Sequence, residues 1–383
     1  MNRRDFLITA GAAVTLPLTK IAAAAARQRF LYIAQPGIRN YVRYGGVGVL
    51  VYDIDAGYKF VRRIPTWSVA PGAEPENVKG IAASAKTGRL YVTTLRHIGC
   101  IDLTNDTMVW DKTPEGGCDR PSISPDGRVL YVPSFEGPHW NVIDAGTGDT
   151  IKKIVLSNRA HNTVWGPGGR HVYLEGLASN NLHVADAKTH EVVKQVGPFA
   201  DHVRPFTVNG AETRCYVNCD NLLGFEIGHI TTGQRLHHVE VAGYEKGPVD
   251  RHGCPSHGIG LTPDETEIWV SDGHNKAMHV FDNTSMPPKQ IATLKVRDQP
   301  GWITFSIDGT HAWPSTGEVF DVKSKKLIAS LTDEDDREIG SEKLLEIDFD
   351  GKKPIRNGDQ FGIGARAVRP SGDANWSDVK KSR

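Results

Sequence analysis

Three histidines occupy one repeated position of this sequence. His161, His202 and His257 each stand eight residues before the residue that closes a turn between two strands. Three neutral imidazoles with an open coordination position suit zinc, copper or iron. Such an ion would polarise a substrate or lower the pKa of bound water. A repeat also copies one residue type into equivalent places, so hydrogen bonding of these histidines to water and loop carbonyls is the other interpretation that the sequence leaves open.

The same position in the remaining units holds charged residues and a glycine. Counting back in the same way reaches Lys343, Asp119 and Gly301, and Lys79 in the unit GIAASAKTG (80–88), which is one residue longer. In a closed arrangement of repeats, equivalent residues meet around one axis. We therefore predict a ring of seven residues at the mouth of a central channel, with the three histidines on consecutive units.

Loops that open on the same face add further polar groups. They carry His97, His139, His274, Cys118, Arg251, His252 and Cys254, with Arg204 and Cys219 close by. Guanidinium groups pair bidentately with carboxylate or phosphate, so a small anionic ligand is expected there. The predicted ligand-binding residues are Arg204, Arg251, Asp119, His97 and His274. Candidate acid or base groups are His139, His252 and Arg251, and the sequence identifies no clear general acid or base among them.

A short strand with an aromatic residue recurs along the chain and must position these groups. Its copies are FLYIA (30–34), RLYVT (89–93), VLYVP (129–133), HVYLE (171–175), RCYVN (214–218), EIWVS (267–271) and HAWPS (311–315). A second strand follows each copy and ends in an acid that we interpret as a turn former: Asp53, Asp102, Asp144, Asp186, Glu226, Asp282 and Asp321. A third strand comes next, so one unit is repeated seven times.

A fourth strand, closed by a turn, precedes most of the aromatic strands. The segment SISPDG (122–127) is an example: Pro presets φ, Asp hydrogen-bonds its own backbone and Gly accepts a positive φ. The pattern predicts an all-β fold, a seven-bladed β-propeller of four-stranded antiparallel blades over residues 27–365. The first unit lacks its inner strand, and KLLEIDFDG (343–351) supplies one, so the C-terminal strand is expected to complete the N-terminal blade and close the ring.

Three motifs carry a resemblance to a known family. The strand CYVNC (215–219), the S-P-D-G turn and the strand end VIDAGTG (142–148) resemble the YVTN-type seven-bladed propeller family. The resemblance covers most of the mature chain and implies the propeller fold. It implies no single activity, because related propellers serve as heavy subunits of amine dehydrogenases, as heme or copper domains of nitrogen-oxide reductases, as lyases and as surface proteins.

Both ends of the chain are predicted to lie outside the propeller. Residues 1–26 contain Arg3-Arg4 followed by Phe6-Leu7, an apolar stretch and an alanine run, which resembles a twin-arginine signal peptide. An ordinary secretory signal is the alternative. Either signal predicts a periplasmic or secreted protein. Residues 366–383 are interpreted as a polar tail.

Composition and missing motifs exclude several classes of partner and cofactor. The formal net charge is zero, which gives no field to attract nucleic acid. No apolar run of the mature chain is long enough for a transmembrane segment. Neither a C-x-x-C-H motif for covalent heme nor a convincing nucleotide-binding motif is present. Among Cys100, Cys118, Cys215, Cys219 and Cys254, the preferred disulfide pair is Cys219 with Cys254.

Three functions are consistent with this pattern. The first is an exported propeller that binds a small anionic ligand, a protein partner of the periplasm or a transition metal at its histidine-rich channel mouth. The second is a metal-dependent lyase or oxidoreductase that acts on an anionic small molecule. The third is a subunit that docks a redox partner and has no metal of its own. The sequence leaves catalysis open.

Overall fold

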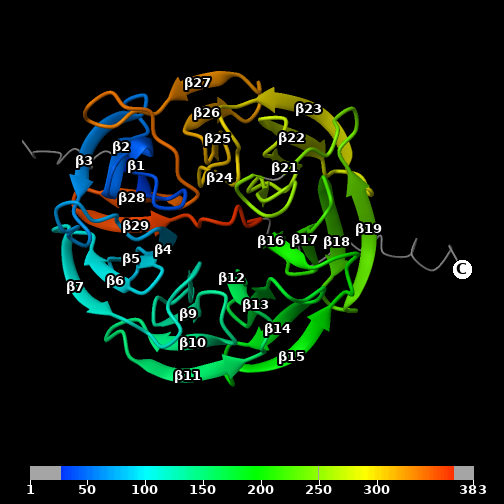
Figure 1. Cartoon of the computed structure of the whole chain (residues 1–383), viewed down its shortest axis with the longest axis horizontal. Helices are drawn as coiled ribbons and strands as arrows, with labels where there is room; N and C mark the ends of the chain where they lie inside the picture. The colour runs from blue at the N-terminus through cyan, green and yellow to red at the C-terminus, as the bar shows by residue number, and fades with distance from the viewer. Residues whose placement is uncertain (1–26, 249, 366–383) are drawn as a thin grey trace, which may run out of the picture.

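Seven β-sheets are arranged in a ring around a central channel (Figure 1). The computed structural model describes residues 27–248 and 250–365. The predicted all-β, seven-bladed architecture is confirmed. The predicted signal peptide, 1–26, and polar tail, 366–383, lie outside the described residues. Within the described residues the only helix is the short 3-10 helix η1 (Val42–Tyr44), and none is long and apolar enough to cross a membrane.

Each blade is an antiparallel sheet, and in every blade but the first the first strand lies nearest the channel. The first blade consists of β28 (Leu344–Asp350), β1 (Arg27–Gln35), β2 (Gly48–Asp53) and β3 (Lys59–Ile64). The second blade has β4 (Val78–Ser84), β5 (Arg89–Thr94), β6 (Ile98–Asp102) and β7 (Thr107–Lys112), and the third has β8 (Ser122–Ile123), β9 (Val129–Pro133), β10 (His139–Asp144) and β11 (Thr150–Val155). The fourth blade has β12 (Ala160–Trp165), β13 (His171–Gly176), β14 (Leu182–Asp186) and β15 (Glu191–Val196).

The last three blades follow the same order. The fifth blade has β16 (Val203–Val208), β17 (Arg214–Cys219), β18 (Gly224–His229) and β19 (Gln234–Glu240). The sixth blade has β20 (Ile259–Leu261), β21 (Glu267–Asp272), β22 (Ala277–Asp282) and β23 (Lys289–Lys295). The seventh blade has β24 (Ile303–Phe305), β25 (His311–Pro314), β26 (Glu318–Asp321) and β27 (Leu327–Ser330).

The recurring aromatic residue of the second strand joins each blade to the next. All seven copies are buried: Tyr32, Tyr91, Tyr131, Tyr173, Tyr216, Trp269 and Trp313. The hydroxyls of four tyrosines bond to the following blade, and Tyr173, for example, donates to Glu212 at 2.8 Å. Burying one such side chain contributes about 1.5–3 kcal/mol. The repeated aromatic therefore supplies both apolar contact and a directional bond between neighbouring blades.

The turn-forming acid is present in six units and replaced in one. Asp144 Oδ1 accepts the backbone N–H of Thr147 at 3.0 Å, as expected for an acid at the end of the third strand. In the fifth blade the equivalent residue is His229, whose Nδ1 accepts the N–H of Thr232 at 3.0 Å. The prediction for Glu226 is wrong, because this residue lies in the middle of β18, where it is buried.

The C-terminal part of the chain closes the ring and then crosses the channel. Strand β28 pairs with β1 in antiparallel register, from Arg27 opposite Asp350 to Ile33 opposite Leu344, as predicted. A further strand, β29 (Lys353–Asn357), pairs with the channel side of β28. The segment 357–364 continues across the centre of the ring (Figure 1), and we call it the plug.

The plug bonds to the inner strands of several blades. Gly362 O accepts from Leu261 N at 2.8 Å, and Gly364 N donates to Val208 O at 3.0 Å. Ala85 N donates to Asn357 Oδ1 at 2.9 Å. These partners stand where the inner strands end, whereas Gln360 of the plug bonds to Trp302 and Pro121, which stand beside the predicted ring where the inner strands begin. The plug therefore closes the far end of the channel and extends inside it toward the ring.

Candidate functional site

Five residues of the predicted ring form a continuous set of contacts. Lys79 Nζ lies 3.4 Å from Asp119 Oδ1, and Asp119 Oδ2 accepts from His161 Nδ1 at 2.7 Å. The imidazoles of His161 and His257 face each other at 6.5 Å between ring centroids. His257 Nδ1 in turn donates to Gly301 O at 3.0 Å. The repeated position thus gathers these residues at the beginning of the inner strands.

His202 does not join this set. Its side chain is half-exposed and lies beside Asp220, with 3.5 Å between Nδ1 and Oδ2. The sequence count took Gly210 as the residue that closes the turn, but the closing residue is Glu212, with φ 52° and an N–H bonded to Asn209 O. Eight residues before Glu212 stands Arg204. The ring position of the fifth blade therefore belongs to arginine, and the prediction that places His202 there is wrong.

Two residues that the sequence analysis missed, Arg120 and Glu342, occupy the centre of the site. The Arg120 guanidinium is 2% exposed and pairs with Glu342. Its Nη1 donates to His161 Nε2 at 3.2 Å, and its Cζ lies over the Trp302 ring, 4.2 Å from the ring centroid. Lys343 Nζ donates to the same Glu342 carboxylate at 2.7 Å. Arg120 and Glu342 are chain neighbours of ring residues, so a search of adjacent positions for long charged side chains would have found them.

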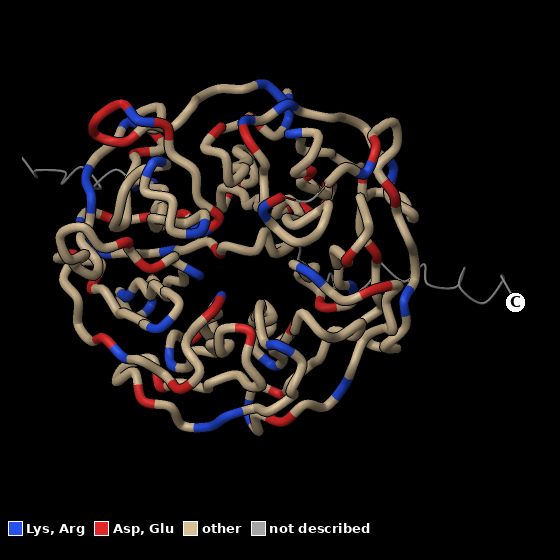
Figure 2. Tube along the Cα trace, in the orientation of Figure 1, with Lys and Arg blue, Asp and Glu red and all other residues tan. Residues whose placement is uncertain are grey.

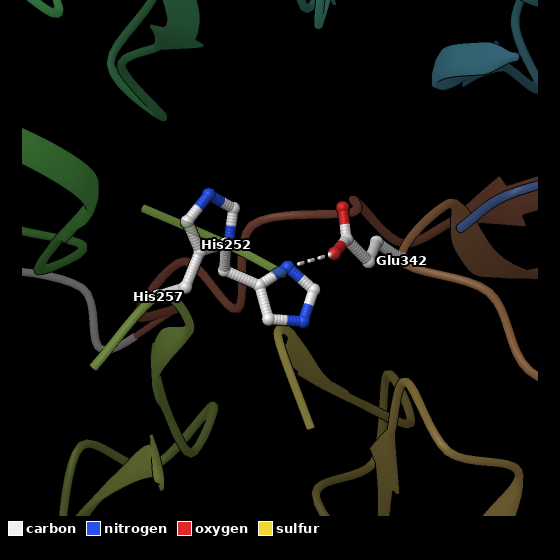
Figure 3. Close-up of side chains that lie close together, drawn as sticks. All are labelled: His252, His257 and Glu342. Carbon is white, nitrogen blue, oxygen red and sulfur yellow. Dashed lines mark ion pairs between the residues drawn. The ribbon is translucent and has the colours of Figure 1, made fainter. Parts of the chain in front are cut away.

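His252 connects this centre to the surface of the channel mouth. Its Nδ1 lies 3.1 Å from Glu342 Oε1, and its Nε2 lies 3.1 Å from Gln299 O. The ring stacks on His257 with 4.9 Å between centroids and 26° between planes (Figure 3). Both nitrogens of His252 thus face acceptors, and both hydrogen bonds form only when the ring carries two protons.

The glycine at the ring position of the seventh blade makes room for His252. A Cβ on Gly301 would lie 2.4 Å from His252 Cε1 and 2.7 Å from Glu342 Oε1. We predict that Gly301→Ala displaces His252 from Glu342 and destabilises the protein by about 1–3 kcal/mol, the usual cost of overpacking. Urea unfolding and the His252 imidazole resonances in an NMR spectrum check this. Unchanged stability and resonances would contradict the close packing.

We call eight residues the mouth cluster: Lys79, Asp119, Arg120, His161, His252, His257, Glu342 and Lys343. Burial alone would raise the pKa of Asp119, but His161 and Lys79 outweigh it and lower that pKa to about 2. Burial likewise opposes ionisation of Glu342, yet Lys343 and Arg120 hold the pKa of this carboxyl well below its usual range. Both carboxyl groups are therefore ionised at neutral pH.

The cationic side of the cluster contains one group that titrates near neutrality. Burial lowers the pKa of Lys343 to about 7, and Arg120 and Lys79 add to this effect while Glu342 opposes it. Burial also lowers the pKa of His161 and that of His257, so both imidazoles are neutral. With His252 not counted, Lys79, Arg120 and Lys343 and the two carboxylates give the mouth cluster a net charge of +1 when Lys343 is protonated. The net charge is zero when Lys343 is neutral.

The predicted metal ligands do not meet around one point. Among the described residues, His257 belongs to a group with His252 and Glu342 whose ligand atoms lie within 4.8 Å, while His202 groups with Asp201 and Asp220. Both nitrogens of His161 are already bonded, to Asp119 and Arg120. Glu342 is held between two cations, which disfavour a third positive charge. The residues around Glu342 therefore fit a divalent metal poorly, and metal binding stays a prediction.

A pocket of about 220 Å³ opens beside the mouth cluster. We call it the mouth pocket, and its polar lining includes Arg251, His252, Cys254, His274, Lys276 and Asp298. Arg251 Nη2 donates to Asp298 Oδ2 at 2.8 Å in the wall. His274 and Lys276 are exposed at the rim, whereas Cys254 is buried at the base. The structure thus brings three of the predicted residues, Arg251, His252 and His274, to one pocket.

The other two predicted histidines lie elsewhere. His97 packs on Trp67 at 5.4 Å between ring centroids and lines a different pocket, between the first two blades. His139 is buried, with its Nε2 3.1 Å from Glu115 O, so its role is to hold a loop.

Charged residues of both signs are distributed around the whole ring, with several at its inner edge (Figure 2).

The cysteines are five buried free thiols, so the predicted disulfide between Cys219 and Cys254 is not formed. Cys254 Sγ instead donates to Ser256 O at 3.3 Å. Burial raises the pKa of the Cys254 thiol well above its ordinary value. A thiol is a weak nucleophile and metal ligand compared with a thiolate. Cys254 therefore lines the mouth pocket as a small neutral group.

Comparison with known proteins supports the fold and leaves the function open. No protein-family model matches the chain, and no curated protein does. Among solved structures, hydrazine synthase from Kuenenia stuttgartiensis is 15% identical, with a TM-score of 0.54 over 73% of this chain and 88% of that chain. The Cps50 (Swd1) β-propeller domain from Myceliophteria thermophila is 10% identical, with the same TM-score and coverage. At these identities the likeness shows the propeller fold alone.

Proposed function

We propose that this propeller binds a small anionic molecule at the channel mouth. The observation that carries the proposal is the excess of buried positive charge in the mouth cluster beside an open pocket. Lys79, Arg120 and Lys343 form ion pairs with two carboxylates of the described residues, Asp119 and Glu342, and burial of a net charge is costly unless a counter-charge accompanies it. An anion supplies that counter-charge.

The mouth pocket offers the route to this charge. His274 and Lys276 stand at its exposed rim, and Arg251 and His252 stand deeper in its wall. His252 belongs to the pocket and to the mouth cluster at once, through its contact with Glu342. An anion entering the pocket would therefore pass His274 and Lys276, contact Arg251 and His252 in the wall, and feel the field of Arg120 and Lys343 behind them.

One buried atom of the mouth cluster supports a bound ligand or water. In the described part of the chain, Arg120 Nε is buried and makes no hydrogen bond, whereas the buried Asp119 Oδ1 has Lys79 Nζ 3.4 Å away. Buried polar atoms without a partner are uncommon and usually mark a bound water, ion or ligand group. A ligand or water that accepts a hydrogen bond from Arg120 Nε would satisfy this atom.

The proposal includes the cellular location and the family. The Arg3-Arg4 pair and the apolar stretch after it support export, so we place the binding function in the periplasm or outside the cell. The YVTN-type motifs support membership of a family in which one scaffold carries many functions. Catalysis is not part of the proposal.

Binding is predicted to weaken as the pH rises through about 7. Lys343 carries its charge below that pH and is neutral above it, because its pKa is lowered to about 7. Loss of one positive charge near an anion costs on the order of 1–2 kcal/mol at an effective dielectric constant near 20, so affinity falls about tenfold between pH 6 and pH 8. Titration calorimetry at the two pH values measures it, and equal affinities would contradict the role of Lys343.

A calorimetric titration tests the proposed function itself. The mature chain is titrated at pH 6 and low ionic strength with acetate, oxalate, citrate and inorganic phosphate. We expect saturable binding of at least one of these anions at one site per chain. The same panel is applied to Arg251→Ala, which removes the guanidinium from the mouth pocket, and affinity should fall. If no anion of the panel binds, the proposal is wrong. Elemental analysis of the same sample checks for a metal.

A further inference from the structure

A second acidic group lies buried close to the mouth cluster, and its hydrogen bonds are incomplete. Glu175, on β13, is 0% exposed. Its Oε2 accepts from Asn162 N at 3.1 Å and from Asn162 Nδ2 at 2.6 Å. Its Oε1 is buried and has no partner within the described residues. Asn162 directly follows His161, so the Glu175 carboxyl is one residue away from the chain of contacts in the mouth cluster.

The cations nearest to Glu175 are committed to other carboxylates. Arg204 pairs with Asp220 through Nε and lies 3.3 Å from Gly253 O through Nη2. Arg120 pairs with Glu342 and His161. Asp119, which is ionised, adds a negative charge, and the Cys254 thiol is neutral. No group packed against Glu175 therefore compensates a negative charge on its carboxyl by a direct pair.

This environment favours the protonated carboxyl. Burial is the largest influence and raises the pKa of Glu175 to about 8, although the Asn162 hydrogen bonds and the fields of Arg204 and Arg120 oppose it. At neutral pH most molecules carry this proton. Arg204 and Arg120 are the two cations whose charge limits the upward shift, and both stand at the channel mouth.

We propose that Glu175 is a proton-binding site linked to the anion site, so that the propeller takes up a proton at Glu175 when an anion binds at the mouth. This inference rests on the proposed function. An anion near Arg120 and Arg204 offsets the positive field that favours the Glu175 carboxylate. The carboxylate form then becomes less favourable, and Glu175 takes one proton from solvent. Linkage makes the effect reciprocal: protonation of Glu175 tightens anion binding by the same factor.

Calorimetry in paired buffers measures this proton directly. The mature chain is titrated at pH 8 with the anion of the panel that binds most tightly, in phosphate-free buffers of low and high ionisation enthalpy. If that anion is phosphate, the second-best anion of the panel is used. A proton taken up from the buffer makes the observed enthalpy depend on the buffer. We expect an uptake of a few tenths of a proton per anion, because Glu175 is about half protonated at this pH.

The variant Glu175→Gln separates this site from other titrating groups. The glutamine side chain has the shape of the protonated acid and keeps an oxygen for Asn162, so the fold should be retained, which circular dichroism verifies. We expect it to bind the anion at pH 8 with a smaller proton uptake, because only the part that belongs to Lys343 remains. The Lys343→Met variant, titrated in parallel, should keep the part of the proton uptake that belongs to Glu175.

The outcomes distinguish the two proposals. Binding with the same proton uptake in wild type and Glu175→Gln would overturn the role of Glu175 and leave anion binding intact. Binding with no dependence on the buffer at pH 8 would do the same. Failure of the wild type to bind any anion of the panel would instead remove the proposed function, on which this inference rests.

Discussion

Arg120→Ala is expected to abolish anion binding and to lower the free energy of unfolding by about 3–5 kcal/mol, the cost of breaking a buried ion pair. The guanidinium is buried between Glu342, His161 and the face of Trp302. Its removal leaves Glu342 with less compensating charge and opens a void beside Trp302. Urea unfolding gives the stability, and titration calorimetry with the anion panel gives the affinity.

Arg128→Ala is the matched control for this variant. Arg128 lies in the same blade, but its side chain is 83% exposed and its nearest carboxylate, that of Asp126, is 3.9 Å away. An exposed pair of this kind contributes little, so both stability and affinity should stay within experimental error of the wild type. Similar losses of stability and anion affinity in the two variants would contradict the role of Arg120 in the fold and in anion binding.

Phe361→Ala is expected to lower the free energy of unfolding by a similar amount, about 3–5 kcal/mol, as for other buried phenylalanines. Phe361 is buried in the plug and packs edge-on against Trp302 at 6.0 Å between ring centroids. Trp302 also donates its indole N–H to Gln360 O. Because the same indole ring carries Arg120 on its face, a loosened plug should weaken anion binding as well.

Ile355→Ala provides the comparison within the same segment of chain. Ile355, on β29, is 46% exposed, and its truncation should change stability by no more than about 0.5 kcal/mol. Urea unfolding of both variants measures the difference. If Phe361→Ala is as stable as Ile355→Ala, the plug contributes nothing to the fold, and the account of the closed channel end is wrong.

The fold was predictable because each blade repeats the same local chemistry. Alternating strands, a buried aromatic and a turn with a fixed spacing recur seven times, and each signal is set by residues close in sequence. The plug could not be predicted in this way. Residues 357–364 form no repeated strand, and their partners, such as Leu261 and Val208, are brought together only by the closed ring.

The candidate site was predictable only where the turn could be identified. The Asn-Gly pair at Asn209 and Gly210 is a strong turn signal. The chain instead places Glu212 at the position with positive φ, which non-glycine residues seldom occupy. The two-residue error exchanged Arg204 for His202 and made the site resemble a metal site. Arg120 and Glu342 were missed because the count considers one residue per blade, while long side chains at adjacent positions reach the same centre.

The position of a bound anion in crystals of the mature chain tests the central claim most directly. Crystals are soaked at pH 6 with the anion of the panel that binds most tightly in solution. The account predicts electron density for that anion in the mouth pocket, in contact with Arg251 or His252 and on the open side of Arg120. Density only at the outer rim of the blades, or between Trp67 and His97, would contradict an anion site at the channel mouth.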